Sequence, residues 1–265
     1  MWLPRHLYND PNLSLLADPD RLFDMPQCEI IKDQKKIRVG RVPVEFGGER
    51  RRVYLKRYNA FSWRYRLGSL FVQSGAFRSW LGAGILMNAG FHTAKPIAAV
   101  ERRSWGMLTR SFYLSEEIPT ARTVDDYWNQ DLLPTGGVKG SRRRREFLNS
   151  LARLFRSLHE TGIYHNDLKD ANILFCSDKG NQDGSFYLLD LEGIGSYRNL
   201  SGRRRLKNLV QLNRTMGKYL RLSERLYLLK VYLGNAYFDR GVKRKWIQRV
   251  LRGSERGDRR SLKKR

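Results

Sequence analysis

The chain has 265 residues, of which 41% are hydrophobic, and it includes 13 Tyr, 12 Phe and 6 Trp. This content excludes a disordered chain and is sufficient for one large domain or two lobes with a packed core. The formal net charge of +25 predicts attraction to polyanions such as nucleic acid, anionic lipid headgroups or phosphorylated glycans, without choosing among them.

Residues 1–28 are rich in Asp, Pro and Asn and are predicted to form an extended, weakly structured N-terminal extension. From Glu29 onward, three segments alternate apolar and polar residues: EIIKD, KIRVGRVPVEF and RRVYLKRY. The GGER stretch between the last two is typical of a hairpin turn. We therefore expect an antiparallel meander that ends on a strand carrying Lys56.

The next segment, FRSWLGAGILMNAGF, is predicted to be a helix with Gly90 as its C-terminal cap. Two more strand-like segments follow it, KPIAAVERR and MLTRSFYLSEE. Residues 29–118 are thus predicted to form a β-rich N-lobe, a small sheet with one inserted helix.

After Pro119 the pattern becomes helical. The segment REFLNSLARLFRSLHETG places apolar residues from Phe147 to Leu158 on one face and ends at Gly162, which predicts an amphipathic helix. NILFCSD and SFYLLDLEG predict a hairpin around KGNQDG, and the chain is helical from Arg203 onward. We expect a mainly helical C-lobe over residues 119–251 and a loose basic tail over 252–265. The predicted fold class is α+β, with two lobes.

Polar chemistry is concentrated in TGIYHNDLKDANILF, residues 161–175. Phosphoryl transfer from ATP needs a cation on the nucleotide phosphates, two oxygen ligands for Mg²⁺ and a carboxylate near the acceptor hydroxyl. Protein kinases arrange these groups as a strand Lys, then H-R-D-L-x-x-x-N, then an Asp after the next strand. Lys56, the string from His165 to Asn172, and Asp190 occur here in the same order. The order predicts an ATP- and Mg²⁺-dependent kinase.

The chemistry of each side chain gives it a predicted role. Asp167 is expected to accept or orient the proton of the acceptor hydroxyl, a contribution of roughly 10²–10⁴-fold in rate. Lys169 is expected to offset the charge of the transferring phosphoryl group. Asn172 and Asp190 offer hard oxygen ligands to Mg²⁺, and Lys56 is expected to bind the α- and β-phosphates.

Three polar residues beside this set, His165, Asp170 and Glu192, are considered separately from the catalytic and metal-binding groups. His165 is predicted to be structural, because the loop already contains a carboxylate, and Asp170 is predicted to be a solvated turn residue. Glu192 is either a second metal partner behind Asp190 or a charged turn residue. The alternative for the whole set is a polar turn plus an unrelated Asp. The coincidence of D-L-K-x-x-N-I-L, the apolar hairpin and a strand Lys argues against that alternative.

These motifs resemble the protein-kinase-like fold and, within it, the lipopolysaccharide core kinases, which phosphorylate Kdo or heptose of the inner core. The closer resemblance lies between about Val39 and Leu222, in VYLKRYN, GFHTAKPIAAVERR, SFYLSEE, GIYHNDLKDANILF, FYLLDLEG and RRRLKNLVQLNRTM. It implies ATP, Mg²⁺ and a glycolipid hydroxyl acceptor on the cytoplasmic face of the inner membrane. The N-lobe would bind the nucleotide, and the C-lobe would hold the catalytic loop and the metal site.

The sequence departs from protein kinases in the segment after Lys56. No Asp or Glu occurs between Lys56 and Glu101, so the usual ion pair with an acid on the following helix cannot form. Ser79 or Trp80 stands about where that acid is expected. Glu101 or Asp190 could hold Lys56 instead, and the sequence does not choose between them.

A second departure is the absence of a G-x-G-x-x-G loop over the phosphates. The turn at that place is KDQKK, and Lys32, Lys35 and Lys36 are predicted to contact phosphate through charge. The two departures leave a weakened or inactive pseudokinase as an alternative.

The basic residues occur in runs that exceed what solubility requires: Arg50–Arg52, Arg142–Arg145, Arg203–Arg205 with Lys207, Lys243–Lys245 and the tail. Such runs predict peripheral docking on an anionic membrane beside a lipid-linked acceptor. A nucleic-acid-binding protein would use the same runs, but no motif of that class is present. A kinase acting on protein or on another small hydroxyl compound is a nearer alternative, although no A-P-E segment follows DLEG. The oligomeric state is not predicted.

The remaining features concern the cellular compartment. The first 16 residues contain prolines and acids where a signal peptide needs a continuous apolar core, and no stretch approaches the ~18 apolar residues of a membrane helix. Cys28 and Cys176 form no C-x-x-C pair, so a cysteine zinc site is not expected and both thiols are predicted to be reduced and buried. We therefore expect a cytoplasmic protein.

Overall fold

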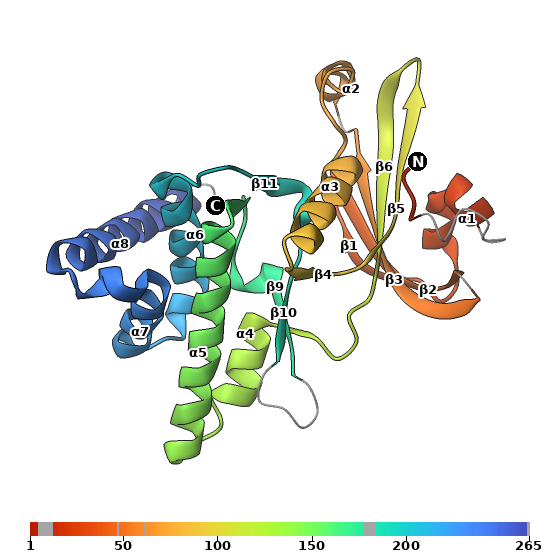
Figure 1. The fold of residues 1–265 in the computed structure, drawn as a ribbon. Helices are drawn as coiled ribbons and strands as arrows, with labels where there is room; N and C mark the ends of the chain where they lie inside the picture. Colours follow the sequence, from red (N-terminus) through yellow and green to blue (C-terminus); the bar gives the residue numbers. More distant parts are fainter. Residues whose placement is uncertain (5–12, 47, 61, 178–183, 264–265) are drawn as a thin grey trace. The chain divides into compact units, whose positions relative to one another are not determined.

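The computed structural model describes residues 1–4, 13–46, 48–60, 62–177 and 184–263. The chain forms two compact units. The N-terminal unit comprises Met1–Pro119 with Asp190–Ile194, and the C-terminal unit comprises Thr120–Leu189 with Gly195–Arg265. The first is built around a sheet and the second is mainly helical (Figure 1), so the predicted α+β fold class is confirmed. Most of the predicted KGNQDG turn, and Gly47 of the GGER turn, lie outside the described residues.

The core of the N-terminal unit is a five-stranded sheet in the order β1-β2-β3-β6-β5, in which every neighbouring pair is antiparallel. The strands coincide with the predicted segments and are β1 (Glu29–Asp33), β2 (Ile37–Phe46), β3 (Glu49–Asn59), β5 (Pro96–Ser104) and β6 (Met107–Glu116). In β3, Lys56 is paired with Val39 of β2 and Tyr113 of β6. Lys56 therefore lies on a central strand.

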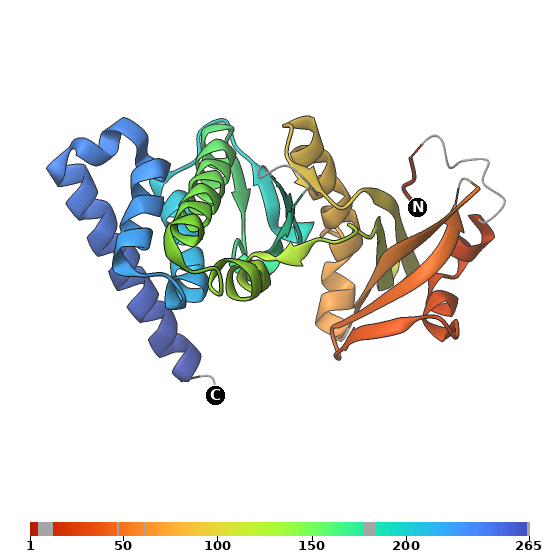
Figure 2. The same ribbon diagram turned by 90° about the horizontal axis from the view of Figure 1, so that it is seen from below.

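The two faces of this sheet carry different side chains because successive residues of a strand point to opposite faces. Val53 and Leu55 of β3 belong to an apolar core shared with α1 (Leu13–Ala17) and η2 (Pro19–Asp24). Lys56 and Tyr58 point to the other face, which is covered by α3 (Gly75–Asn88). Figures 1 and 2 show α3 on one side of the sheet and the N-terminal helices on the other.

The prediction of a weakly structured N-terminal extension is wrong for its described residues. Leu16 and Leu22 are completely buried against the sheet, and the backbone of Trp2 is hydrogen-bonded to Ala99 in both directions. The Asp20 carboxylate is paired with Arg57 at 2.8 Å and with Arg110. Residues 13–24 cover an apolar sheet face that would otherwise be exposed to water, which accounts for their regular structure.

Two short elements of the N-terminal unit were not expected from the sequence. They are α2 (Trp63–Gly68), directly before α3, and β4 (His92–Thr93), directly after it. The predicted C-terminal cap of α3 is present, since Gly90 has a left-handed φ of 79° and Ala89 donates to the last turn. Between the two short elements, α3 therefore begins and ends close to the predicted positions.

Four long helices form most of the C-terminal unit: α5 (Gly137–Glu160), α6 (Gly202–Thr215), α7 (Leu222–Leu233) and α8 (Arg240–Leu262). The helix α5 packs against α7, and α6 packs against α8. The predicted loose tail is wrong through Leu262, because α8 continues through it. Asp239 caps its first turn, and Asp258 is paired with Arg214 of α6 at 2.9 Å.

The short strands of the C-terminal unit carry the polar loop. β9 (Ile173–Cys176) is antiparallel to β10 (Ser185–Leu188), as predicted, and to β7 (Arg122–Thr123). β8 (Ile163–His165) precedes the loop and is paired with β11 (Ile194–Ser196). The remaining short elements are α4 (Val124–Tyr127), η3 (Trp128–Leu132), η4 (Asp170–Asn172), η5 (Leu191–Gly193), η6 (Met216–Lys218) and η7 (Gly234–Phe238).

An aromatic cluster fixes the β9–β10 hairpin against the helices. Phe175 of β9 and Phe186 of β10 have ring centroids 5.0 Å apart. Phe147 of α5 lies 5.1 Å from Phe175, and Tyr127 of α4 lies 4.5 Å from it. These contacts bury the apolar half of the NILF segment, so the polar residues before it are held at a rigid boundary.

Cys28 and Cys176 are not joined in a disulfide, and both are half-buried, so the prediction that they are buried is wrong. None of the described helices is long and apolar enough to cross a membrane.

Candidate active site

The loop of the C-terminal unit begins at His165, which is 1% exposed. Its Nδ1 accepts a hydrogen bond from the Asp167 N–H at 3.1 Å, so the ring proton is on Nε2, which donates to the Leu189 carbonyl at 2.7 Å. The imidazole thus connects the backbone of the loop at Asp167 with the backbone of the chain at Leu189. This geometry agrees with the structural role predicted for His165.

Three of the predicted site residues contact one another within this loop. Lys169 Nζ lies 2.8 Å from Asp167 Oδ2. The Asn172 amide nitrogen donates to the Asp167 carbonyl at 2.7 Å and to Asp167 Oδ2 at 3.1 Å. The Asp167 side chain is nevertheless 43% exposed, so its carboxylate can reach a substrate. Because the Asn172 nitrogen faces Asp167, its Oδ1 atom is the one available to a cation.

Helix α6 supports the loop with three side chains. The sequence singled out Lys207 only as part of a basic run, and it did not single out Asn208 or Gln211. Lys207 Nζ donates to Asn166 Oδ1 at 2.7 Å, and Gln211 Nε2 donates to the Asn166 carbonyl at 2.8 Å and to Asp167 Oδ1 at 3.3 Å. Asn208 is completely buried and donates to the His165 carbonyl at 2.6 Å. The i, i+3 spacing of Asn208 and Gln211 puts both on one helix face, which was the available signal.

Asn208 also connects the loop to His159 at the end of α5. Asn208 Oδ1 accepts from His159 Nε2 at 3.1 Å, and His159 Nδ1 is 2.8 Å from the Tyr232 hydroxyl of α7. Burial lowers the pKa of His159 to about 4, despite the opposing hydrogen bond to Asn208. His159 is therefore neutral at pH 7, and the loop is tied to three helices through one uncharged network.

The prediction that Asp170 is a solvated turn residue is wrong. Asp170 is only 5% exposed, and its carboxylate accepts from the Ala171 N–H at 2.8 Å. Burial raises its pKa above the usual value, although hydrogen bonds from Thr215 and Ala171 oppose the shift. Asp170 thus fixes the turn that leads into Asn172, and it is not a surface residue.

The second part of the predicted set lies in the N-terminal unit. Lys56 Nζ is 2.6 Å from Asp190 Oδ1, while Glu101 is paired with Arg103 at 3.0 Å. Of the two partners considered for Lys56, the structure therefore selects Asp190. Burial alone would lower the pKa of Lys56, but Tyr58 and the Asp190 carboxylate outweigh it and raise that pKa above its usual range. The ammonium is permanently charged at neutral pH.

Asp190 itself has an unusual backbone. Its φ of 56° and ψ of 57° are left-handed, a conformation that costs a non-glycine residue free energy but that Asp tolerates better than most. Its neighbour in sequence, Leu189, donates its N–H to the Asn172 carbonyl at 2.9 Å. Strain at such a position is typical of functional sites.

The helix α3 carries no acid that could pair with Lys56. It forms an ion pair of the opposite polarity, in which α3 supplies the base. Arg78 of α3 lies 3.5 Å from Glu192 Oε2, so the helix supplies the base and the DLEG segment supplies the acid. The neighbouring Ser79, where the acid was expected, shares a 2.9 Å hydrogen bond with the Tyr58 hydroxyl. Lys56 and Arg78 thus hold two successive acids of one segment.

Close packing of α3 on that segment depends on Gly82. A Cβ atom at Gly82 would lie 2.3 Å from the Leu191 carbonyl oxygen, which is far inside van der Waals contact. A Cβ atom at Gly84, two residues along the same helix, would meet nothing within 4 Å. Only the first glycine is required by the approach of α3 to the residues that follow Asp190.

The lysines of the β1–β2 turn are exposed. Gln34 and Ile37 exchange backbone hydrogen bonds across this turn, and Asn59 of β3 binds the carbonyls of Lys35 at 3.0 Å and Lys36 at 2.9 Å. The turn is therefore fixed to β3, the strand that carries Lys56. A phosphate-binding role for Lys32, Lys35 and Lys36 stays a prediction.

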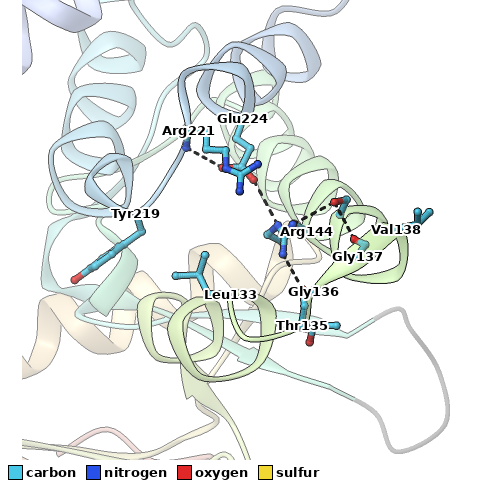
Figure 3. A pocket seen from close by; sticks show the side chains of 10 residues that line it. Leu133, Thr135, Gly136, Gly137, Val138, Arg144, Tyr219, Arg221 and Glu224 are labelled. Carbon is cyan, nitrogen blue, oxygen red and sulfur yellow. Dashed lines mark hydrogen bonds and ion pairs between the residues drawn. The ribbon is translucent and has the colours of Figure 1, made fainter.

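A separate cavity of about 590 Å³ lies in the C-terminal unit, between the start of α5 and the start of α7 (Figure 3). Its polar groups already satisfy one another. Arg144 donates to the carbonyls of Leu132 and Thr135 at 3.1 and 3.0 Å, and Glu224 accepts from the Arg221 N–H at 2.8 Å. None of the predicted site residues lines this cavity, so we do not place the chemistry there.

Comparison with a solved structure shows the fold of the chain. WaaP in complex with acyl carrier protein matches with a TM-score of 0.67 and 21% identity, over 96% of this chain and 99% of that one. The likeness shows a shared fold. Together with the loop around Asp167 and the Lys56–Asp190 pair, it identifies the fold as protein-kinase-like.

The family is defined by sequence. The model of the lipopolysaccharide kinase (Kdo/WaaP) family matches residues 26–232, so the chain belongs to that family. A 3-deoxy-D-manno-octulosonic acid kinase of Haemophilus influenzae (strain PittGG) is 30% identical over 138 residues, 51% of each chain. The enzyme of the same name from strain 86-028NP is 28% identical over 133 residues, 50% of each chain. The chain spans about half the length of these curated relatives.

Proposed function

We propose that this protein is an ATP- and Mg²⁺-dependent kinase that phosphorylates a sugar hydroxyl of the lipopolysaccharide inner core. The observation that carries the proposal is the Asp167 carboxylate, exposed yet held by Lys169, Asn172 and Gln211. The family match supports the substrate class. The names of the relatives that match half of the chain make Kdo the first acceptor to test, with heptose as the alternative.

In this mechanism Asp167 orients the acceptor hydroxyl and takes its proton as the phosphoryl group is transferred. Lys169, 2.8 Å from Asp167, offers a positive charge to the phosphoryl oxygens. Lys56 holds the α- and β-phosphates through its ammonium group.

The oxygen donors at the two ends of the motif are of the kind that Mg²⁺ prefers. Asn172 Oδ1 and the Asp190 carboxylate are hard oxygen ligands, and a bound Mg²⁺ would neutralise charge on the phosphates there. No cluster of three or more His, Cys, Asp or Glu side chains that could hold a metal is found among the described residues. Mg²⁺ commonly uses only one or two protein oxygen ligands and otherwise keeps waters and binds substrate phosphates.

The connection after DLEG favours a small or glycan acceptor over a protein. β11 ends at Ser196, and α6 begins at Gly202 with Ser201 as its N-cap. A segment that could serve as a peptide-docking activation loop is not present between them. Beside the Arg203–Arg205 run, the Arg204 guanidinium lies 3.8 Å from the centre of the Tyr197 ring, which disfavours stacking of a base on that ring.

We propose peripheral docking on the cytoplasmic face of the inner membrane beside the acceptor. Two arginines of the basic runs have structural partners: Arg144 and Arg205 donate hydrogen bonds to backbone carbonyls inside the C-terminal unit. These two guanidinium groups are therefore less available to lipid headgroups. The other basic side chains still provide electrostatic attraction that should weaken as salt is added.

The test is phosphate transfer from γ-labelled ATP to de-phosphorylated lipopolysaccharide by the purified protein. We expect transfer that needs Mg²⁺ and that Asp167→Asn reduces by roughly 10²–10⁴-fold. Mass spectrometry of lipopolysaccharide from cells with and without the protein gives the sugar and the position. ATP binding without transfer would support the pseudokinase alternative, and full activity of Asp167→Asn would refute the role of that carboxylate.

A further inference from the structure

Six large apolar side chains are exposed together at one end of the N-terminal unit. They belong to α2, to the segment after it and to the tip of the β5–β6 hairpin, and we call them the apolar tip: Trp63, Leu67, Leu70, Phe71, Val72 and Trp105. Phe71 is 90% exposed and Trp105 is 94% exposed. Removing such groups from water is favourable, so several exposed apolar side chains on neighbouring segments indicate a binding surface.

Hydrogen bonds join the two segments of the apolar tip. The Leu108 N–H of β6 donates to Ser69 Oγ at 2.8 Å. Arg103 of β5 donates to the carbonyls of Ser69 at 3.3 Å and Gly106 at 2.9 Å. Figure 1 shows α2 and the end of the β5–β6 hairpin at the same edge of the unit. The apolar side chains are therefore presented by a tied surface and not by two independent loops.

The hairpin turn holds Trp105 in a strained backbone conformation. Trp105 and Gly106 have positive φ values of 53° and 74° between the paired residues Ser104 and Met107. A two-residue turn of this kind favours Asn-Gly or Asp-Gly, because a bulky residue is strained at positive φ. A strained and almost fully exposed tryptophan lowers the stability of the free protein, which points to a role in binding.

The charge around the apolar tip is positive. No Asp or Glu occurs anywhere between Lys56 and Glu101, while α2 itself contains Arg64 and Arg66. The Arg64 guanidinium lies 5.6 Å from the ring of Trp63. Glu101, the acid that ends this acid-free stretch, is paired with Arg103. The partner must therefore combine negative charge with an apolar interior.

We propose that the apolar tip inserts into the interfacial layer of an anionic lipid bilayer, with Arg64 and Arg66 at the headgroups. Trp and Phe are the side chains that prefer this layer, and neighbouring basic residues add attraction to anionic lipid. The inference deepens the proposed function by naming the surface that meets the membrane. It rests on that function only for the choice of a bilayer that contains the acceptor.

The first test measures binding of the full chain to vesicles of phosphatidylcholine with anionic phosphatidylglycerol, by co-sedimentation at low and high salt. The variant Phe71→Ser/Trp105→Asn removes two aromatic side chains, and Asn is favoured at the positive φ of the turn. We expect its partition coefficient to fall by roughly tenfold or more. Part of the wild-type binding should persist at high salt, because insertion is not screened.

The matched control is Phe238→Ser in the C-terminal unit, where Phe238 is 71% exposed. It makes the same chemical change outside the apolar tip and should bind vesicles like the wild type. Vesicles with brominated acyl chains give a second readout. They should quench part of the tryptophan fluorescence of the wild type and of Phe238→Ser, and that part should be smaller in Trp105→Asn.

Equal vesicle binding by the wild type and the double variant, or no difference in quenching with Trp105→Asn, overturns the proposal. A protein partner is the other occupant to test, with acyl carrier protein as the probe because the structural relative was solved with it. If the double variant loses binding to acyl carrier protein but not to vesicles, the membrane assignment is wrong.

Activity assays separate this inference from the proposed function. The double variant should phosphorylate a water-soluble, deacylated core sugar at the wild-type rate and vesicle-embedded lipopolysaccharide more slowly. Absence of transfer to either acceptor by the wild type refutes the kinase function alone, because vesicle binding and quenching are measured without turnover.

Discussion

Lys56 and Asp190 are 134 residues apart in sequence, and their side chains form a 2.6 Å ion pair within the N-terminal unit. In protein kinases the strand lysine is held by a glutamate of the following helix. Here that helix has no acid, and Lys56 is bound directly by the aspartate that we propose as a metal ligand. The same helix instead donates Arg78 to Glu192, two residues after Asp190.

Replacing Lys56 with Met should lower kcat/KM for ATP by roughly 10²–10³-fold, because one charged group aimed at the phosphates is lost. The control is Lys95→Met, since Lys95 is 49% exposed and is paired at 3.7 Å with Glu116. Both values come from initial rates over a range of ATP concentrations. If Lys56→Met behaves like Lys95→Met, Lys56 does not bind the nucleotide.

Glu192→Gln decides between the two roles left open for Glu192. Because Glu192 is paired with Arg78, we expect a loss of about 0.2–1 kcal/mol in the free energy of unfolding. The apparent Mg²⁺ affinity in the kinase assay should not change. If Glu192 were a metal partner, Glu192→Gln would instead weaken the apparent Mg²⁺ affinity by roughly 10–100-fold.

Gly82→Ala should lower the free energy of unfolding by about 1–3 kcal/mol and reduce kinase activity, since the new Cβ collides with the Leu191 carbonyl. The matched variant Gly84→Ala has free space around its Cβ and should raise stability by roughly 0.5–1 kcal/mol. Urea denaturation measures both. Equal effects of the two substitutions would show that α3 does not need close contact with this segment.

Asn208→Ala should destabilise the protein by about 1–3 kcal/mol, because the His165 carbonyl and His159 lose their buried partner. It should also lower kcat more than it raises KM for ATP, since the loop that carries Asp167 is no longer held. Asn213→Ala is the control, because Asn213 lies on the same helix but binds Ser254. A variant that loses stability yet retains the wild-type kcat would contradict the positioning role.

His159 predicts how stability depends on pH. Its pKa is lowered from 6.5 to about 4 by burial, so the unfolded chain binds the proton more readily than the folded protein. The contribution of His159 to the free energy of unfolding is therefore fully present above pH 6.5. It is lost as the pH decreases toward 4, and the loss is on the order of 3 kcal/mol. Urea denaturation at pH 7 and pH 5 should show about 2 kcal/mol of this loss. In His159→Gln the difference between the two pH values should be smaller, and an unchanged difference would exclude His159 as its source.

The strand and helix pattern was readable from the sequence because local periodicity determines it. The five strands of the N-terminal sheet, the helix after Lys56 and the hairpin after Asn172 are where alternation, apolar spacing and turn residues predict them. Composition was a poor guide at the two ends. The Asp- and Pro-rich start covers a sheet face, and the basic tail continues α8, because contacts with distant residues stabilise both segments.

The sequence by itself determined which chemical groups are present and their order along the chain: Lys56, then Asp167, Lys169 and Asn172, then Asp190. Only the tertiary structure decided which side chains hold them. Asn208 and Gln211 reach the loop, Arg78 takes Glu192, and Asp170 is buried. The physical reason is the separation along the chain of the residues that interact. Secondary structure follows from the neighbours of a residue in sequence, whereas these partners are brought together by packing between elements that are far apart along the chain.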